Sequence, residues 1–277
     1  MRDVSFLKEN GVDVDKSLEL FGDIEMYNDS IIDFINDASK KLEQLKTYKE
    51  NADMANYAIQ VHALKSDARY FGFTKLADMA LDQEMKSKAN DMYYISDHFD
   101  ELEKEAEKAL NIAKVYLGKE ENVKASSEKP EEEQTEEKTT DDFMNQVEKD
   151  KTILIVDDSE VIKNFIQKIF NNKYQILVAS DGNEAMRAIE KGMYSKLVGV
   201  LLDLNMPNVN GFQVLEFFKE NNLFERIPVS IITGVGADEL VQKAYEYPIV
   251  DVLRKPFNEN DIKNVVEKTV SRYVDID

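Results

Sequence analysis

The chain has 277 residues, enough for two domains of ordinary size, and its 55 aspartates and glutamates outnumber its 35 lysines and arginines, giving a net charge of −20. This acidic balance disfavours binding to duplex DNA or to an anionic membrane surface, because both attract positive charge. The absence of cysteine excludes disulfides and thiolate metal sites, and no apolar run suits a membrane span or a signal peptide, so we expect a cytoplasmic protein without membrane insertion.

Residues 1–118 have the pattern of a helical bundle. Apolar residues recur at steps of three and four, which marks one face of a helix. Three such stripes are Ile31, Ile35, Ala38, Leu42 and Leu45; Val61, Leu64, Ala68 and Phe71; and Phe99, Leu102, Ala106, Leu110, Ala113 and Leu117. Four long helices and a short leading one, joined by short polar segments, predict an all-α, four-helix-type antiparallel bundle.

Residues 119–150 have the composition of a linker. They contain 12 acidic and 5 basic residues, a net charge of −7 (5 minus 12), and little apolar content. Such a segment is typically disordered and self-repelling, so we expect a solvated tether that lets the two domains meet or stay apart. A short helix containing Phe143, Met144 and Val147 is expected just before the second domain.

Residues 151–277 change to an α/β pattern. Helical stretches separate five short apolar runs, at Ile153–Val156, Ile176–Ala179, Val198–Leu202, Val229–Ile232 and Val250–Leu253. Strands that alternate with helices predict βαβ units and a parallel sheet. We therefore expect a multidomain chain in which a bundle is followed by an α/β domain.

Polar residues follow four of these strands. Asp157 and Asp158 follow the first, Asp203 ends the third, Thr233 follows the fourth and Lys255 follows the fifth. The carboxyl ends of parallel strands meet at one edge of a sheet, so these side chains are expected to lie close together. Clustered carboxylates repel one another unless neutralised, and an oxygen-rich pocket suits Mg²⁺.

This constellation predicts phosphoryl transfer to Asp203. A metal ion, an ammonium group and a hydroxyl group around one nucleophilic carboxylate supply the positioning and charge neutralisation that the reaction needs. Asp157 and Asp158 alone could instead cap the helix that begins near Ser159. The polar residues at the other strand ends favour the pocket.

The second domain resembles the receiver domain of bacterial response regulators. Four segments carry the resemblance, in order: Ile153–Asp158, Asp203–Pro207 with Asn210-Gly211, Thr233-Gly234, and Lys255–Phe257. It implies a flavodoxin-like (β/α)5 sheet with strand order 2-1-3-4-5. It further implies phosphorylation at Asp203, Mg²⁺ ligands at Asp157, Asp158, Asp203 and the backbone carbonyl of Asn205, and phosphoryl contacts from Thr233 and Lys255. The aromatic residue that receivers usually carry three positions before the lysine is Val252 here, which puts the usual output switch in doubt.

One histidine of the first domain stands out. At 100° per residue, His62 projects roughly 140° from the centre of the stripe formed by Val61, Leu64, Ala68 and Phe71, which predicts exposure to solvent. Lys65, Ser66 and Arg69 share or flank its face, and the two cations could counter a phosphoryl group. An exposed imidazole is a competent nucleophile near neutral pH, although an ordinary surface histidine is the alternative. We take His98 to be such a surface histidine.

The segment His62-Ala63-Leu64-Lys65-Ser66, with Gly72 ten residues after the histidine, resembles a histidine-phosphotransfer (HPt) domain. The resemblance covers roughly residues 1–118. It implies a helical bundle with a phosphorylatable histidine at His62 and a supporting lysine at Lys65. Ser66 stands where this family usually has glycine, a mild departure because the side chain stays small.

The favoured interpretation is a two-component phosphorelay protein that carries phosphoryl groups on His62 and Asp203. Its partners would be a sensor histidine kinase, other receivers or other HPt proteins, because the chain shows no autokinase site for ATP. The direction of transfer, and whether it occurs within one chain, stay open. One alternative is an adaptor whose bundle binds a partner without relaying phosphate. An aspartyl phosphatase is disfavoured because Asn205 stands where a second carboxylate would act as the acid, and a DNA-binding regulator is disfavoured by the acidic charge.

Overall fold

The first part of the molecule is entirely helical. The computed structural model describes residues 4–118, 150–192, 196–234 and 238–273. Two short helices, α1 (Ser5–Glu9) and α2 (Val14–Phe21), precede four long ones: α3 (Ile24–Glu50), α4 (Met54–Tyr70), α5 (Thr74–Lys88) and α6 (Met92–Tyr116). The three predicted apolar stripes are buried. The bundle prediction is therefore confirmed, with two short leading helices in place of one.

The second part alternates strands and helices around one sheet. Its elements are β1 (Lys151–Val156), α7 (Glu160–Phe170), β2 (Gln175–Ala179), α8 (Gly182–Glu190), β3 (Lys196–Asp203), α9 (Gly211–Glu220), the 3₁₀ helix η2 (Leu223–Glu225), β4 (Val229–Thr233), α10 (Asp238–Ala244), β5 (Val252–Arg254) and α11 (Glu259–Val270). All neighbouring strands are parallel, in the order β2-β1-β3-β4-β5. This confirms the flavodoxin-like order.

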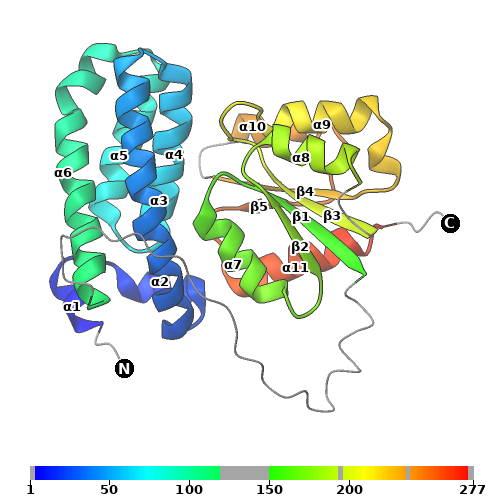
Figure 1. Cartoon of the computed structure of the whole chain (residues 1–277), viewed down its shortest axis with the longest axis horizontal. Helices are drawn as coiled ribbons and strands as arrows, with labels where there is room; N and C mark the ends of the chain where they lie inside the picture. The colour runs from blue at the N-terminus through cyan, green and yellow to red at the C-terminus, as the bar shows by residue number, and fades with distance from the viewer. Residues whose placement is uncertain (1–3, 119–149, 193–195, 235–237, 274–277) are drawn as a thin grey trace, which may run out of the picture.

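The sheet is covered on both faces. Figure 1 shows α7 and α11 on one face and α8, α9 and α10 on the other. Successive side chains of a strand point to opposite faces. In β1, Ile153 and Ile155 accordingly join one apolar cluster, whereas Leu154 and Val156 join another. Burial on both faces explains why β1 and β3 are continuous apolar runs rather than alternating ones.

All five predicted strands coincide with observed strands to within two residues at each end. The fifth, expected at Val250–Leu253, begins at Val252 and ends at Arg254. The predicted linker lies outside the described residues except for residue 150, as does the short helix expected at residues 143–147. Among the described helices, none combines the length and the apolar character needed to cross a bilayer.

The bundle and the α/β domain pack directly against each other. In Figure 1, α3 and α4 are the long bundle helices on the side of the sheet domain, and α7 is the sheet-domain helix beside α3. One apolar cluster runs without a break from the bundle into the face of the sheet covered by α7 and α11. Phe21 of α2 meets Phe165 of α7 edge to face, with ring centroids 5.5 Å apart. Since aromatic pairs of this geometry stabilise buried contacts, the two domains share a core at this boundary.

Candidate functional site

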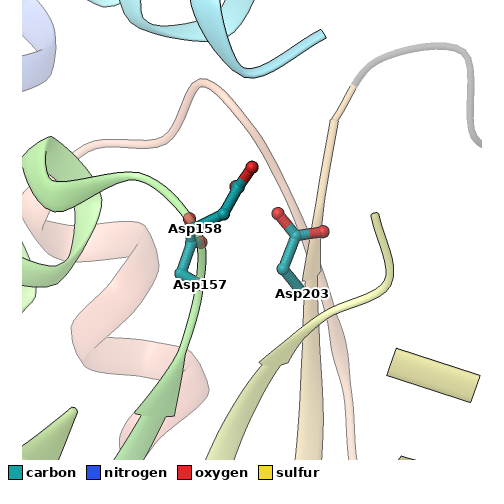
Figure 2. Close-up of side chains that lie close together, drawn as sticks. All are labelled: Asp157, Asp158 and Asp203. Atoms are coloured by element: carbon teal, nitrogen blue, oxygen red, sulfur yellow. The ribbon is translucent and has the colours of Figure 1, made fainter. Parts of the chain in front are cut away.

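Three carboxylates meet at the carboxyl edge of the sheet. Asp157 and Asp158 follow β1, Asp203 is the last residue of β3, and each offers an oxygen within 4.8 Å of the others (Figure 2). Lys255, which follows β5, places its Nζ 2.6 Å from Oδ2 of Asp157 and 2.6 Å from Oδ2 of Asp203. The expected convergence of strand ends is therefore observed. Within the described residues, this is the one group of acids close enough to share a metal ion.

Burial shapes the charges of this pocket. It raises the pKa of Asp157 to about 6, with Asp203 adding to the rise and Lys255 opposing it. Burial, and then repulsion from Asp157, hold the pKa of Asp158 well above its usual range. Burial alone would lower the pKa of Lys255, but the surrounding carboxylates outweigh it and raise that pKa. Lys41 of α3 also lowers the pKa of Asp158, but it is itself paired with Asp37 and Asp67. The three carboxylates therefore still exceed the positive charge available to them, so a cation would be stabilised there.

Besides Oδ2 of Asp157, which forms an ion pair with Lys255 at 2.6 Å, two polar atoms of the pocket are buried without a hydrogen-bond partner among the described residues: Oδ2 of Asp158 and Oγ1 of Thr233. Such buried atoms are rare, because an unmade hydrogen bond costs about 1–3 kcal/mol. An oxygen-binding cation would satisfy the first atom, and an incoming phosphoryl oxygen would satisfy the second. The residues present thus fit both Mg²⁺ and a phosphoryl group.

Asp203 is held in a fixed orientation. The backbone N–H of Asn205 donates a hydrogen bond to its Oδ1 at 2.9 Å, and Lys255 donates to its Oδ2. Asn205 therefore lies beside the pocket, while the metal contact expected of its carbonyl stays a prediction. Val252 lies in β5 and is partly buried.

His62 and Lys65 belong to a buried polar cluster between α4 and α5. Nδ1 of His62 lies 2.8 Å from Oε1 of Glu84, and Lys65 donates to Oε2 of Glu84 at 2.6 Å. Lys88 donates to the same carboxylate from the exposed side. Burial alone would raise the pKa of Glu84, but these hydrogen bonds outweigh it and lower that pKa. An ionised carboxylate in this position accepts a hydrogen bond from a protonated Nδ1. The other ring nitrogen of His62, Nε2, then keeps its lone pair available.

The prediction that His62 is exposed to solvent is wrong. His62 is 8% exposed, because the α/β domain covers it. A Cβ atom added to Gly234 would lie 2.4 Å from Nε2 of His62, so the imidazole lies directly against that glycine. Gly234 follows Thr233, which lines the carboxylate pocket. The helical period correctly turned His62 away from the apolar stripe, but it carried no information about a second domain on that side.

Sequence reasoning missed Glu84 and a second polar cluster, formed by Lys41, Asp37 and Asp67. Lys41 of α3 is 2% exposed and pairs with Asp37 at 2.5 Å and with Asp67 of α4 at 2.6 Å. Asp67 in turn accepts a hydrogen bond from the hydroxyl of Ser159, at 2.8 Å across the domain boundary. A lysine and an aspartate inside apolar stripes are a detectable signal, although their partners lie too far along the chain to be identified by spacing.

Comparison with known proteins finds one family match in each part of the chain. Residues 29–111 match the family model of the Hpt domain, and residues 153–267 match that of the response regulator receiver domain. The chain is 32% identical to sporulation initiation phosphotransferase F of Bacillus subtilis (strain 168) over 117 residues, which are 42% of this chain and 90% of that protein.

Two further relatives cover a similar share of the chain. One is the "Probable transcriptional regulator ycf29" of Pyropia yezoensis, 25% identical over 123 residues, which are 44% of this chain and 54% of that protein, so the chain spans about half of this relative. The other is the crystal structure of a CheY-like receiver domain protein from Methanospirillum hungatei JF-1, with 27% identity, a TM-score of 0.37, and coverage of 44% of this chain and 93% of that one.

Proposed function

Because this chain belongs to the two-component signalling proteins, with an Hpt domain followed by a response regulator receiver domain, we propose that it relays phosphoryl groups between His62 and Asp203. A histidine kinase or another two-component protein would supply or receive the group. We propose a cytoplasmic location and the division at residues 1–118, 119–150 and 151–277 as parts of the same hypothesis.

The polar cluster around His62 suits the donor half of the reaction. With Nδ1 holding its proton against Glu84, the lone pair of Nε2 carries the phosphoryl group. On transfer, the Nε2–P bond breaks as a carboxylate oxygen of Asp203 forms a new bond to phosphorus, and the electron pair returns to Nε2. The imidazole becomes neutral while Nδ1 keeps its proton, so no general acid is needed.

The pocket around Asp203 suits the acceptor half. Lys255 would hold one phosphoryl oxygen and the hydroxyl of Thr233, buried without a partner among the described residues, would donate to another. Asp157, Asp158 and Asp203 would hold Mg²⁺, with the backbone carbonyl of Asn205 as a further ligand. When bound, the ion would neutralise charge on the phosphoryl oxygens. Lys65, whose Nζ lies beside Nδ1 of His62, would counter the negative charge of a phosphoryl group on the histidine.

One observation carries this proposal: Nε2 of His62 lies against Gly234, the residue after Thr233 at the carboxyl end of β4, the strand beside the one that ends at Asp203. Phosphoryl transfer depends mainly on positioning. A chain that brings the free nitrogen of one candidate phosphoacceptor to the pocket of the other meets that requirement. A surface histidine without function would have no reason to lie there.

The test supplies a radiolabelled small acyl phosphate and Mg²⁺ to the wild type, Asp203→Asn and His62→Gln. Label on aspartate is base-labile and label on histidine is acid-labile. We expect the wild type to carry both forms, His62→Gln to carry the aspartyl form alone, and Asp203→Asn to take up little label. If Asp203→Asn takes up label at the wild-type rate and in the same form, Asp203 is not the acceptor. If His62→Gln still relays phosphate to a partner protein, the histidine has no role in transfer.

A further inference from the structure

Helix α4 of the bundle contacts three of the four receiver loops that carry the pocket, those after β1, β4 and β5. Asp67 accepts a hydrogen bond from the hydroxyl of Ser159, which lies in the loop after Asp157 and Asp158. His62 lies against Gly234, in the loop after Thr233. Tyr70 accepts a hydrogen bond at 3.0 Å from the backbone N–H of Phe257, in the loop after Lys255. One helix therefore touches each of these three loops through a different residue.

These contacts are built as a buried interface. Asp67 is 0% exposed and Tyr70 is 1% exposed, and the rings of Tyr70 and Phe257 meet edge to face with centroids 5.9 Å apart. Lys41 of α3 forms an ion pair with Asp67, so the carboxylate that bonds to the receiver is neutralised from inside the bundle. Buried polar groups are costly unless they are paired. Separating the two domains would expose or unpair each of these groups.

The interface also closes the pocket. Asp203 is 2% exposed, although the carboxyl edge of an open parallel sheet is where ligands normally enter. A cavity between α4 and the segment Lys255-Pro256 measures about 10 Å³, space for about one water molecule. This leaves little space between α4 and the loop that carries Lys255. In this arrangement, His62 of the same chain lies against Gly234, at the same edge of the sheet as Asp203.

We propose that the bundle is the built-in docking partner of the receiver in its own chain. A phosphoryl group then passes between His62 and Asp203 within one molecule, and outside phosphodonors reach Asp203 only when the two domains separate. The inference rests on the proposed function and adds the partner to it. Because both domains belong to one chain, docking does not depend on protein concentration, which favours the internal partner over an external one.

Two tyrosines of α4 give a matched test. Tyr70 makes its hydrogen bond across the boundary, whereas Tyr57, equally buried, donates to Gln83 inside the bundle. Tyr70→Phe leaves the backbone N–H of Phe257 without its hydrogen-bond partner when the two domains are docked. Because a lost buried hydrogen bond costs about 1–3 kcal/mol, the equilibrium constant for separation of the domains should rise by roughly 5- to 150-fold. We expect the full-length Tyr70→Phe variant to take up label from a small acyl phosphate on the order of tenfold faster than the wild type. Tyr57→Phe should stay within about twofold.

A second variant locks the interface. The chain has no cysteine, so Asp67→Cys combined with Ser159→Cys introduces a single disulfide between two positions whose side chains now share a hydrogen bond. We expect this pair to close under mild oxidant even in dilute protein. The oxidised form should label at Asp203 at least tenfold more slowly than the same protein after reduction. Equal rates for the oxidised and reduced forms, or for Tyr70→Phe and the wild type, would overturn the proposal.

The two hypotheses fail in different ways. If no variant takes up label, the proposed phosphorelay is wrong, whereas disulfide closure still measures docking. If label enters Asp203 normally but the cysteines stay reduced in dilute protein, the relay stands and the built-in partner is wrong.

Discussion

The hydroxyl of Ser159 donates a hydrogen bond to Oδ1 of Asp67 at 2.8 Å, joining the receiver to the bundle. Ser159 is also the N-cap of α7, because its Oγ accepts the backbone N–H of Ile162. The same oxygen therefore starts the first receiver helix and connects it to α4. Any change at this position affects both the helix terminus and the domain boundary.

We predict that Asp67→Asn loosens the boundary, whereas Asp37→Asn does not. Both changes remove one carboxylate beside Lys41, but among the described contacts Asp67 alone of the two bonds to Ser159. Asp67→Asn should lower the free energy of unfolding by about 1–3 kcal/mol, as expected for a disrupted buried charged hydrogen bond. Amide exchange in the first turn of α7 should speed up in Asp67→Asn. Equal exchange rates in the two variants would contradict this.

We predict that Glu84→Gln slows transfer through His62 by about ten- to a hundredfold, as expected for a residue that orients a functional histidine. The neutral amide can present its N–H to Nδ1, which favours the wrong tautomer and puts a proton on Nε2. The measurement is the rate of transfer of label from histidine to aspartate against pH. Glu105→Gln is the matched control, because Glu105 accepts from Lys75 at an exposed position away from His62. If the pH profile of transfer is unchanged in Glu84→Gln, Glu84 does not set the tautomer of His62.

The sequence predicted the residues of the carboxylate pocket better than the domain contact that buries them. Asp157, Asp203 and Lys255 are brought together by the parallel sheet itself, so recognising strand ends was sufficient to place them. His62 was turned correctly away from the bundle core, but its burial depends on a domain that begins almost ninety residues later along the chain. No local period encodes such a contact. Glu84 lies on the next helix, and its partnership with His62 is set by helix packing rather than by spacing within one helix.

We predict that Asp158→Asn stabilises the metal-free protein at pH 7. Burial and Asp157 hold the pKa of Asp158 well above its ordinary value, so keeping it ionised opposes folding at neutral pH. The amide is neutral and removes this cost, for an expected gain of about 1–3 kcal/mol. Because the folded-state pKa is raised, the gain should disappear as the pH falls below the ordinary carboxyl value near 3.8.

The control for Asp158→Asn is Asp100→Asn, which changes an exposed aspartate of α6 and should leave stability unchanged. Thermal unfolding with and without Mg²⁺ measures both effects. Mg²⁺ should stabilise the wild type and the control but not Asp158→Asn. An Asp158→Asn protein that is less stable than the wild type without metal would show that the buried carboxylate does not oppose folding. An Asp158→Asn protein that gains as much stability from Mg²⁺ as the wild type would show that Asp158 is not a ligand.

We predict that protons compete with Mg²⁺ near pH 6. Burial raises the pKa of Asp157 to about 6, above its ordinary value of 3.8. In the metal-free protein, its contribution to stability is therefore full below about pH 4 and is lost as the pH rises through 6. Bound Mg²⁺ needs the ionised carboxylate, so metal stabilisation changes in the opposite direction. The apparent affinity for Mg²⁺ should be about tenfold weaker at pH 5 than at pH 7.5, because about a tenth of Asp157 is ionised at pH 5. Mg²⁺ titrations of the full chain followed by calorimetry measure this difference, and equal affinities at the two pH values would exclude Asp157 as a ligand.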